Sequence, residues 1–206
     1  MVVVALASGL VLQCRASGLR AFDCVDNMAL KATICKAELA ISDMDRHVYD
    51  TVNLTLAQHP SETTERIMVR LLAFAFNAQE RLEFTRGLST DDEPDLWVRN
   101  YADEVELWIE LGQPDEKRIR KACNKARQAI IYGYHGRQAN LWWDSVKSEC
   151  ARHKNLRVVN FDGTAVEQLE KLYQRTMRLQ ATIQDGLMWL GDGNHSVEIA
   201  SEVWQG

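Results

Sequence analysis

The hydrophobic pattern changes its period several times along the chain, and the order of these changes limits the folds that it can adopt. Apolar residues first recur with the 3.6-residue spacing of a helix and then in short alternating runs typical of strands. A proline followed by two acidic residues, Pro114 to Glu116, marks the start of a second helix. The pattern predicts helix, three strands, helix and strand over residues 59–78, 81–88, 96–100, 103–112, 114–127 and 129–134.

Further strands flank this series at both ends. Residues 30–41 and 47–57 alternate apolar and polar side chains around a polar turn, which predicts an antiparallel hairpin. Near the other end, Asp185-Gly186 and the segment 191–194 are hairpin signals between alternating strands. The pattern also predicts a helix, a strand and a helix over residues 138–151, 156–161 and 165–176. We therefore expect one mixed α/β domain, with the flanking hairpins available to build a second sheet.

The chain has 206 residues, of which 46% are hydrophobic and 26% charged, and this composition suits one soluble globular domain. Its formal net charge of −5 excludes a global basic field, so any contact with nucleic acid must come from a local patch. The five cysteines include no Cys-x-x-Cys pair and indicate neither a disulfide framework nor a zinc site. They suit a reducing compartment, and we expect a cytoplasmic protein.

The first 27 residues differ from the rest of the chain. The segment MVVVALASGLVLQC is apolar, but no Lys or Arg precedes Arg15, and the run is too short to span a membrane. A second possible start follows at Met28. We therefore expect residues 1–27 to be a disordered upstream extension, residues 28–206 to form a single domain, and no membrane to be a partner.

Three acidic residues are predicted to share one face of the sheet. Pairing Val98 with Val105 across the intervening turn brings Glu93 and Asp95 onto the same face as Glu110. Converging carboxylates repel one another unless a cation lies between them. Mg²⁺ takes one or two carboxylates and leaves positions for phosphate oxygens, so this pattern indicates phosphodiester hydrolysis.

Charged residues on the two helices each allow two interpretations. Glu62 is expected in the first turn of the first helix, after a Ser61 cap, with Arg66 and Arg70 one and two turns beyond it. These side chains suit a metal and phosphate site, but they also suit the helix dipole and a solvated charge ladder. The second helix carries a basic face, which suits either solvent or a phosphate backbone. That face comprises Lys117, Arg118, Arg120, Lys121, Lys125 and Arg127.

Several longer segments resemble the YaeQ family over nearly the whole chain from Met28. These segments are HPSETTERIMVRLLAFA, RLEFTRGL, DDEP, LWIELGQPDEKRIRKA and RTMRLQATIQDGLMWL. The family is similar in fold to the restriction-endonuclease-like PD-(D/E)XK superfamily, whose core order of helix, three strands, helix and strand agrees with the order above. The resemblance therefore implies such a core, with extra antiparallel hairpins at both ends.

The resemblance also assigns roles to particular positions. It places the acid of the superfamily's helix on Glu62, the acid of the second core strand within residues 92–95, and the acid of the third strand on Glu110. The superfamily's lysine falls on Gly112, which has no side chain to position water. Neighbouring residues that could substitute for this lysine are Gln113, Lys117, Arg66 and Arg70. Three residues of the C-terminal part, Gln180, Thr182 and Gln184, could line the same cleft.

Two hypotheses follow for function. The first is a Mg²⁺- or Mn²⁺-dependent nuclease or phosphodiesterase with a displaced lysine. In this hypothesis the catalytic residues are Glu62, Glu93, Glu110, Gln113 and Lys117, the metal ligands are Glu93, Glu110 and Asp95, and the phosphate-binding residues are Arg66 and Arg70. The second is a catalytically inactive module with the same fold that binds nucleic acid or a protein. The acidic cluster favours the first hypothesis, and the missing lysine and acidic net charge favour the second.

Overall fold

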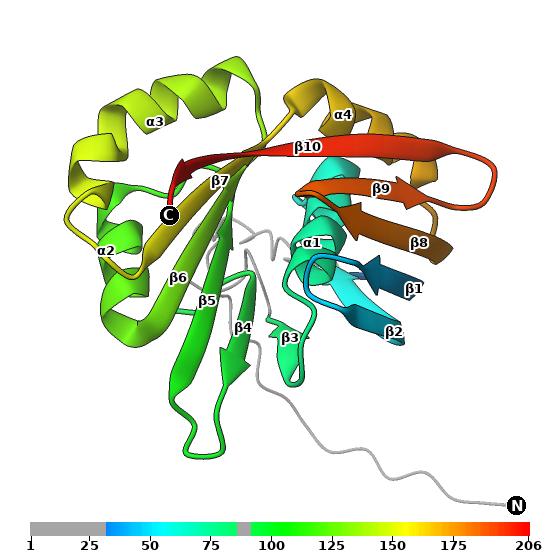
Figure 1. Ribbon diagram of the computed structural model, residues 1–206, viewed down its shortest axis with the longest axis horizontal. Coiled ribbons are helices and arrows are strands. Elements are labelled where there is room, and N and C mark those ends of the chain that lie inside the picture. Colours follow the sequence, from blue (N-terminus) through cyan, green and yellow to red (C-terminus); the bar gives the residue numbers. More distant parts are fainter. Residues whose placement is uncertain (1–31, 86–91) are drawn as a thin grey trace, which may run out of the picture. The chain divides into compact units, whose positions relative to one another are not determined.

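Ten strands form one mixed sheet in this computed structural model, which describes residues 32–85 and 92–206 (Figure 1). The strands are β1 (Thr33–Asp43), β2 (Val48–Gln58), β3 (Leu82–Phe84), β4 (Leu96–Arg99), β5 (Val105–Leu111), β6 (Ala126–Gly133), β7 (Leu156–Phe161), β8 (Thr176–Gln184), β9 (Leu187–Gly191) and β10 (Ser196–Gln205). The helices are α1 (Thr64–Phe76), α2 (Glu116–Lys125), α3 (Arg137–Cys150) and α4 (Gly163–Leu169), which continues into a 3₁₀ turn at Glu170–Leu172.

The strand order across the sheet is β2-β1-β8-β9-β10-β7-β6-β5-β4-β3. Strand β10 joins the two halves, because its residues 196–200 pair with β9 and its residues 201–205 pair with β7. Parallel pairs connect β1 with β8, β5 with β6, and β6 with β7. The helices that precede β6 and β7 make the long connections that parallel strands require.

The predicted order of elements is confirmed, whereas the second sheet that the flanking hairpins could have built does not form. Helix α1, strands β3 to β5, helix α2 and strand β6 follow one another as the hydrophobic pattern indicated. The terminal hairpins form as predicted, with β1 antiparallel to β2 and with β8, β9 and β10 in antiparallel succession. Parallel pairing of β1 with β8 and the split pairing of β10 merge all ten strands into one sheet.

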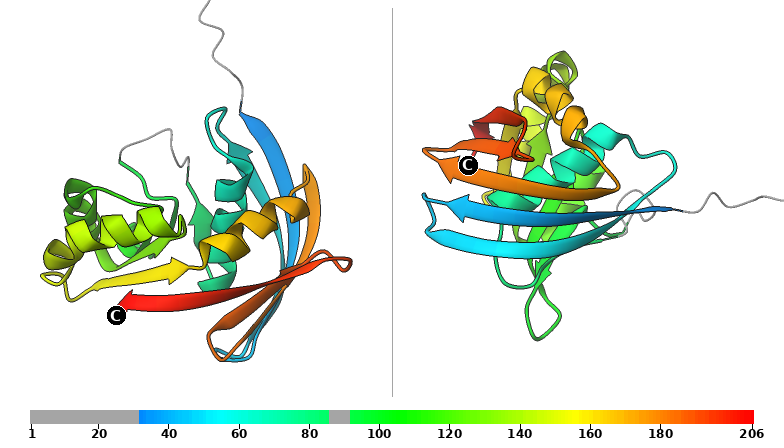
Figure 2. Two further views of the ribbon diagram at one scale, coloured as in Figure 1. Left: turned by 90° about the horizontal axis from the view of Figure 1, so that it is seen from above. Right: turned by 90° about the vertical axis from the view of Figure 1, so that its right-hand side faces the viewer.

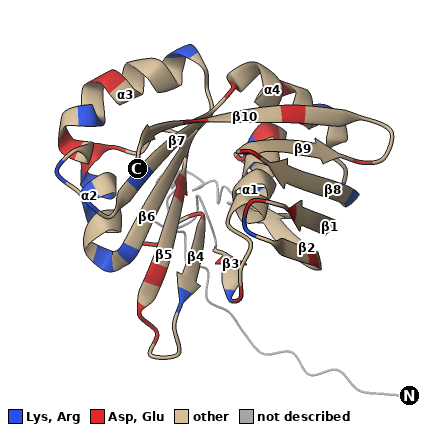
Figure 3. Cartoon of the chain, viewed as in Figure 1, with Lys and Arg blue, Asp and Glu red and all other residues tan. Residues whose placement is uncertain are grey.

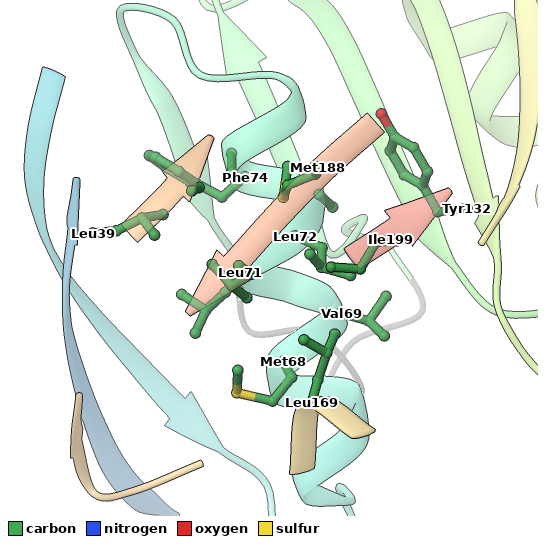
Figure 4. Close-up of a cluster of buried hydrophobic side chains, with 14 of the residues drawn as sticks. Leu39, Met68, Val69, Leu71, Leu72, Phe74, Tyr132, Leu169, Met188 and Ile199 are labelled. Atoms are coloured by element: carbon green, nitrogen blue, oxygen red, sulfur yellow. The ribbon is translucent and has the colours of Figure 1, made fainter. Parts of the chain in front are cut away.

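The sheet curls around α1, which lies within its curve (Figure 2). Residues 67–75 of this helix are all buried, so α1 has no solvent-facing stripe over these two and a half turns. The surrounding side chains come from both halves of the sheet and from α4, and they include Leu39, Tyr132, Leu169, Met188 and Ile199 (Figure 4). Burial of this apolar surface on all sides of α1 is the main force that holds the curled sheet closed around it.

Helices α2 and α3 cover the other face of β5, β6 and β7. A second cluster there includes Trp108, Ile119, Ile131 and Val146. Along β5, residues 107, 109 and 111 belong to the α1 cluster, whereas Trp108 belongs to the α2 cluster. Both faces of this part of the sheet are thus buried, as parallel strands usually are.

Helix α1 begins later than the sequence predicted. Thr63, not Ser61, is the N-cap, and its side chain accepts a hydrogen bond from the backbone N of Arg66 at 3.2 Å. Glu62 therefore lies before the first turn of α1 rather than within it. At the other end, Arg46 donates to the carbonyls of Ala75 and Ala78, which satisfies acceptors that a helix end leaves open.

The pairing of β4 with β5 differs from the predicted register by two residues. Val98 lies opposite Leu107 rather than Val105, and an irregularity after Val98 places Arg99 opposite Val105. Because side chains alternate with a period of two, such a shift keeps each strand residue on its expected face and changes only its neighbours.

Parts of the sequence predictions lie outside the described residues. The expected extension 1–27 and the acidic residue Asp91 belong to this group, and so does the boundary expected at Met28. Within residues 32–85 and 92–206, no helix combines the length and apolar character needed to cross a membrane.

Candidate functional site

Arg66 joins two of the predicted site carboxylates. Its Nη2 donates to Asp95 Oδ1 at 2.6 Å, and its Nε lies 3.7 Å from Glu62 Oε1. Its Nη1 also donates to the carbonyl of Leu111 at 3.2 Å, which ties α1 to the end of β5. The second oxygen of Asp95 accepts from the backbone N of Leu111 at 2.9 Å. Both oxygens of Asp95 are therefore occupied by donors of the chain itself.

Arg70 lies one turn further along α1 and is 1% exposed. Its Nη1 is 3.4 Å from both carboxylate oxygens of Glu62. The same guanidinium donates to the carbonyl of Ala57 in β2 and to that of Thr85, which follows β3. Because β2 and β3 are the two edges of the sheet, Arg70 links one edge to the other across α1.

Burial dominates the electrostatics of Glu62. Removal from water raises the pKa of this carboxyl, while the charges of Arg70 and Arg66 and a hydrogen bond from the backbone of His59 act in the opposite direction. The nearby Asp95 raises it further. Glu62, Arg66, Arg70 and Asp95 thus form one buried ion-pair network, which we call the α1 network.

Glu110 belongs to a separate pairing on the other face of the sheet. Its Oε1 accepts from Trp108 Nε1 at 2.7 Å and lies 2.9 Å from Arg118 Nε on α2. Burial raises its pKa to about 7, the charge of Arg118 lowers it, and that of Asp95 raises it. Asp95 and Glu110 are close enough for their charges to interact, but each holds a different arginine, Arg66 from α1 and Arg118 from α2.

Glu93 and Asp92 lie in the segment before β4, where α2 approaches it. Arg118 Nη2 donates to the carbonyl of Glu93 at 2.8 Å, while Lys121 Nζ lies 2.5 Å from the exposed carboxylate of Asp92. The side chain of Glu93 is half-buried. The structure therefore places Glu93 beside α2 and its basic residues rather than beside the α1 network.

The chain turns at Gly112, the position that corresponds to the superfamily's lysine. Gly112 has φ +92°, in the left-handed region that favours glycine, and its N donates to the carbonyl of Tyr132 at 2.9 Å. The next residue, Gln113, has its side-chain amide within hydrogen-bond distance of His135 Nδ1. A side chain at residue 112 would therefore carry backbone strain, which gives a physical reason for glycine there.

We expect Gly112→Ala to lower the free energy of unfolding by about 1–2 kcal/mol, because alanine tolerates this φ poorly. The Cβ itself would meet only ordinary contacts, at 3.7 Å from Arg66 Nη1 and 3.9 Å from the Tyr134 ring, so the loss reports backbone strain. Gly112→Lys should lose more, because its ammonium would lie near Arg66. Urea unfolding of the three proteins measures these differences, and an unchanged Gly112→Ala variant would contradict the assigned strain.

Basic residues of α2 surround a hollow beside Glu93. This hollow, which we call the α2 hollow, has a volume of about 370 Å³ and is lined by Asp115, Lys117, Arg118 and Lys121. Asp115 is the N-cap of α2, and its side chain accepts from the backbone N of Arg118 at 2.7 Å. Figure 3 shows the basic residues of α2 in blue. Sequence analysis placed Arg118 on this basic face but missed its contact with Glu110, which required the α2–β5 packing.

Other parts of the basic face are neutralised by acidic neighbours. Arg120 lies 3.2 Å from Glu149 on α3, and Arg127 lies 3.3 Å from Glu106 on β5. These pairings match the solvated-face interpretation. The α2 hollow is thus the part of the face where Lys117, Arg118 and Lys121 come together.

The carboxylates do not fit a divalent metal in this arrangement. A metal needs free carboxylate oxygens on one side of a site. Both oxygens of Asp95 hold donors, Glu62 faces two arginines, and Glu110 holds Trp108 and Arg118. In the part of the chain that the structure describes, no group of three or more His, Cys, Asp or Glu side chains is arranged to hold a metal ion.

The remaining candidates lie away from these carboxylates. Gln180 and Thr182 line a small hollow with Trp189 on the outer face of β8, so they do not line a cleft with the α1 network, contrary to expectation. Gln184 is exposed at the end of the same strand. Trp142 and Trp143 are half-buried and pack against the second cluster, between the sheet and helices α2 and α3.

The described cysteines are free and buried: Cys35, Cys123 and Cys150. Burial raises the pKa of Cys123 and of Cys150 to about 11, which keeps both thiols protonated at neutral pH. Neither thiol therefore has the thiolate character that a nucleophile needs.

The fold is of the mixed α/β class. A curled sheet encloses a helix, and buried carboxylates pair with arginines. Within that class, the family model described as YaeQ protein matches residues 28–201, and the chain belongs to the YaeQ family. It is 51% identical over 178 residues to the uncharacterized protein YaeQ of Salmonella typhi, covering 86% of this chain and 98% of that one. The Escherichia coli (strain K12) protein of the same name is 49% identical over the same shares.

Two solved structures have a similar fold. The crystal structure of YaeQ protein from Xanthomonas axonopodis pv. citri has a TM-score of 0.83 and 54% identity, over 85% of this chain and 99% of that chain. The YaeQ protein from Pseudomonas syringae has a TM-score of 0.81 and 35% identity, over 85% and 97%. The predicted family is thereby confirmed, together with a mixed α/β fold.

Proposed function

We propose that this protein is a non-hydrolytic module that binds the phosphate backbone of nucleic acid at the α2 hollow. We further propose that its core is of the restriction-endonuclease-like PD-(D/E)XK type. The order α1, β3, β4, β5, α2, β6, with β6 parallel to β5, supports that core. The observation that carries the proposal is that arginines neutralise Glu62, Asp95 and Glu110 where a nuclease of this fold would need metal ligands.

The hollow supplies suitable chemistry for phosphate. Among the described residues, Lys117, Arg118 and Lys121 line the hollow with Asp115, which α2 uses as its cap, and Lys121 also holds Asp92 at the surface. Phosphate oxygens attract such clusters at close range even when the net charge of the protein is negative. Arg118 lies between Glu110 and the hollow, so part of its charge stays engaged with the chain.

Metal-dependent hydrolysis, with catalysis by Glu62, Glu93, Glu110, Gln113 and Lys117, stays a prediction. Glu93 is half-buried, in the segment before β4 that α2 approaches. The raised pKa of Glu110 is a feature that functional carboxyls share with buried structural ones. Hydrolysis would require Arg66 and Arg118 to release their carboxylates before a Mg²⁺ or Mn²⁺ ion could bind.

The binding proposal is tested by fluorescence anisotropy with labelled single- and double-stranded oligonucleotides. We expect saturable binding at about 50 mM salt that weakens steeply toward about 200 mM, because bound phosphates release counterions. Lys117→Glu combined with Lys121→Glu should weaken binding at least about tenfold. A matched control, Lys36→Glu with Lys171→Glu, makes the same charge change at exposed positions outside the hollow and should lose much less.

Two results would overturn the proposal. Absence of binding at low salt, or equal losses in both double variants, would remove the α2 hollow as the binding site. Saturable Mn²⁺ binding by calorimetry that disappears in Glu110→Gln would instead establish a carboxylate metal site and favour hydrolysis.

A further inference from the structure

A second hollow lies near the C-terminal end of α1, on the inner face of the sheet, which is the face that packs against this helix. With a volume of about 630 Å³, it falls within the usual range of small-molecule sites, about 300–1,000 Å³. We call it the inner hollow. Its walls come from the first residues of β5, β6 and β7, the end of β4, and Gln79 after α1. Within the described part of the chain, it shares no lining residue with the α2 hollow.

The inner hollow is basic. Among the described residues, Arg127, Lys154 and Arg157 line it together with the acidic side chain of Glu106, which lies 3.3 Å from Arg127, and with Gly206. Among residues 32–85 and 92–206, neither Lys154 nor Arg157 forms an ion pair. This local excess of positive charge contrasts with the net charge of −5 of the whole chain.

The orientation of Arg157 follows from the alternation along β7. Val159 and Phe161 face α1, and Val158 faces the α2–α3 cluster, so Arg157 projects to the same inner face as Val159. Its charge lowers the pKa of Tyr132, whose buried hydroxyl lies on that face, against the larger raising effect of burial. Arg157 thus lies on the α1 side of β7, where its side chain is exposed at the start of the strand.

Other lining residues supply the remaining parts of a ligand site. Gln79 and Gln128 bring amide groups that make no hydrogen bond within the described chain. Val98 and Leu107, paired across β4 and β5, give an apolar floor. A ring can lie against that floor, while amides hydrogen-bond its polar edges and cations hold an attached anion.

We propose that the inner hollow binds a small organic phosphate of mononucleotide size, with its phosphate at Arg157 and Lys154 and its ring over Val98 and Leu107. Because Arg127 is already matched by Glu106, Lys154 and Arg157 are the lining cations that attract the phosphate. The volume of about 630 Å³ admits one such molecule.

Calorimetry with the full chain tests this proposal in metal-free buffer at low salt, using adenosine 5′-monophosphate, inorganic phosphate and adenosine as probes. We expect the monophosphate to bind more tightly than phosphate, and adenosine to bind least. Arg157→Gln should weaken binding of the monophosphate about tenfold or more, as loss of a charge-assisted hydrogen bond does. Gln128→Glu should also weaken it, by placing a negative charge in the hollow.

The control is Arg178→Gln, which removes an exposed arginine from β8 and should leave affinity unchanged. Equal affinity of Arg157→Gln and the control would overturn the site, and so would absence of binding by any probe at millimolar concentration. Adenosine binding as tightly as its monophosphate would overturn the assignment to a phosphate. Lys117 and Lys121 are unchanged in these variants, so the outcome is independent of oligonucleotide binding at the α2 hollow.

Discussion

Replacing Arg70 by methionine should lower the free energy of unfolding by about 3–5 kcal/mol, the usual loss when one partner of a buried ion pair is removed. Arg70 is 1% exposed, and its removal leaves Glu62 with the more distant charge of Arg66 and the hydrogen bond from the backbone N of His59. It also leaves the carbonyls of Ala57 and Thr85 without this donor. Urea unfolding at neutral pH measures the loss.

Two variants separate the charge from the packing. Glu62→Gln combined with Arg70→Met should be more stable than Arg70→Met alone, because no buried charge remains unpaired. Arg178→Met, at an exposed position of β8, should change stability by less than about 0.5 kcal/mol. A loss in Arg70→Met no larger than that of Arg178→Met would show that Arg70 does not stabilise the closure of the sheet.

Glu110 should make the stability of the protein depend on pH. Its pKa is raised from 4.5 to about 7 in the folded state, so this carboxyl holds its proton more tightly in the folded protein than in the unfolded chain. The stabilisation is present below pH 4.5 and is lost as pH rises to about 7. The free energy of unfolding of Glu110→Gln, relative to that of the wild type, should therefore rise by on the order of 3 kcal/mol between acidic and mildly alkaline pH.

Glu149 provides a matched control for this experiment, because it is also buried and paired with arginines. Although burial raises its pKa, hydrogen bonding and charge from Arg120 and Arg152 lower it overall. Glu149→Gln should show no such gain above pH 5, since Glu149 is ionised there in both states. Urea unfolding from pH 5 to 8 distinguishes them, and a flat difference for Glu110→Gln would contradict the assigned proton linkage.

The sequence predicted local structure better than long-range pairing, for physical reasons. The period of the hydrophobic pattern located α1, α2 and the strands between them, because burial of one face dictates that period. It could not locate the register of β4 and β5, since a shift of two residues leaves every strand side chain on the same face. The observed start of α1 also differs from the predicted one, because Ser61 and Thr63 are both residue types that cap helices.

The candidate site was predicted as a set of residues but not as an arrangement. Glu62, Arg66, Arg70 and Asp95 do come together, yet as ion pairs rather than as metal and phosphate ligands. Helical spacing indicated that Glu62 and the arginines were neighbours, and no local signal showed that Asp95 would reach Arg66 from another element. Likewise, Arg118 became a partner of Glu110 only through the packing of α2 on β5.

The parallel pairing of β1 with β8 has a consequence for the order in which the protein folds. Residues at the start of the described chain, such as Lys36, find their partners near its end, at Thr176. A ribosome therefore releases the β1–β2 hairpin long before β8 exists, and closing so long a loop is entropically costly and slow. Until then, β1 presents an unpaired edge that invites association with other chains, so newly made molecules should be most prone to aggregate before synthesis is complete.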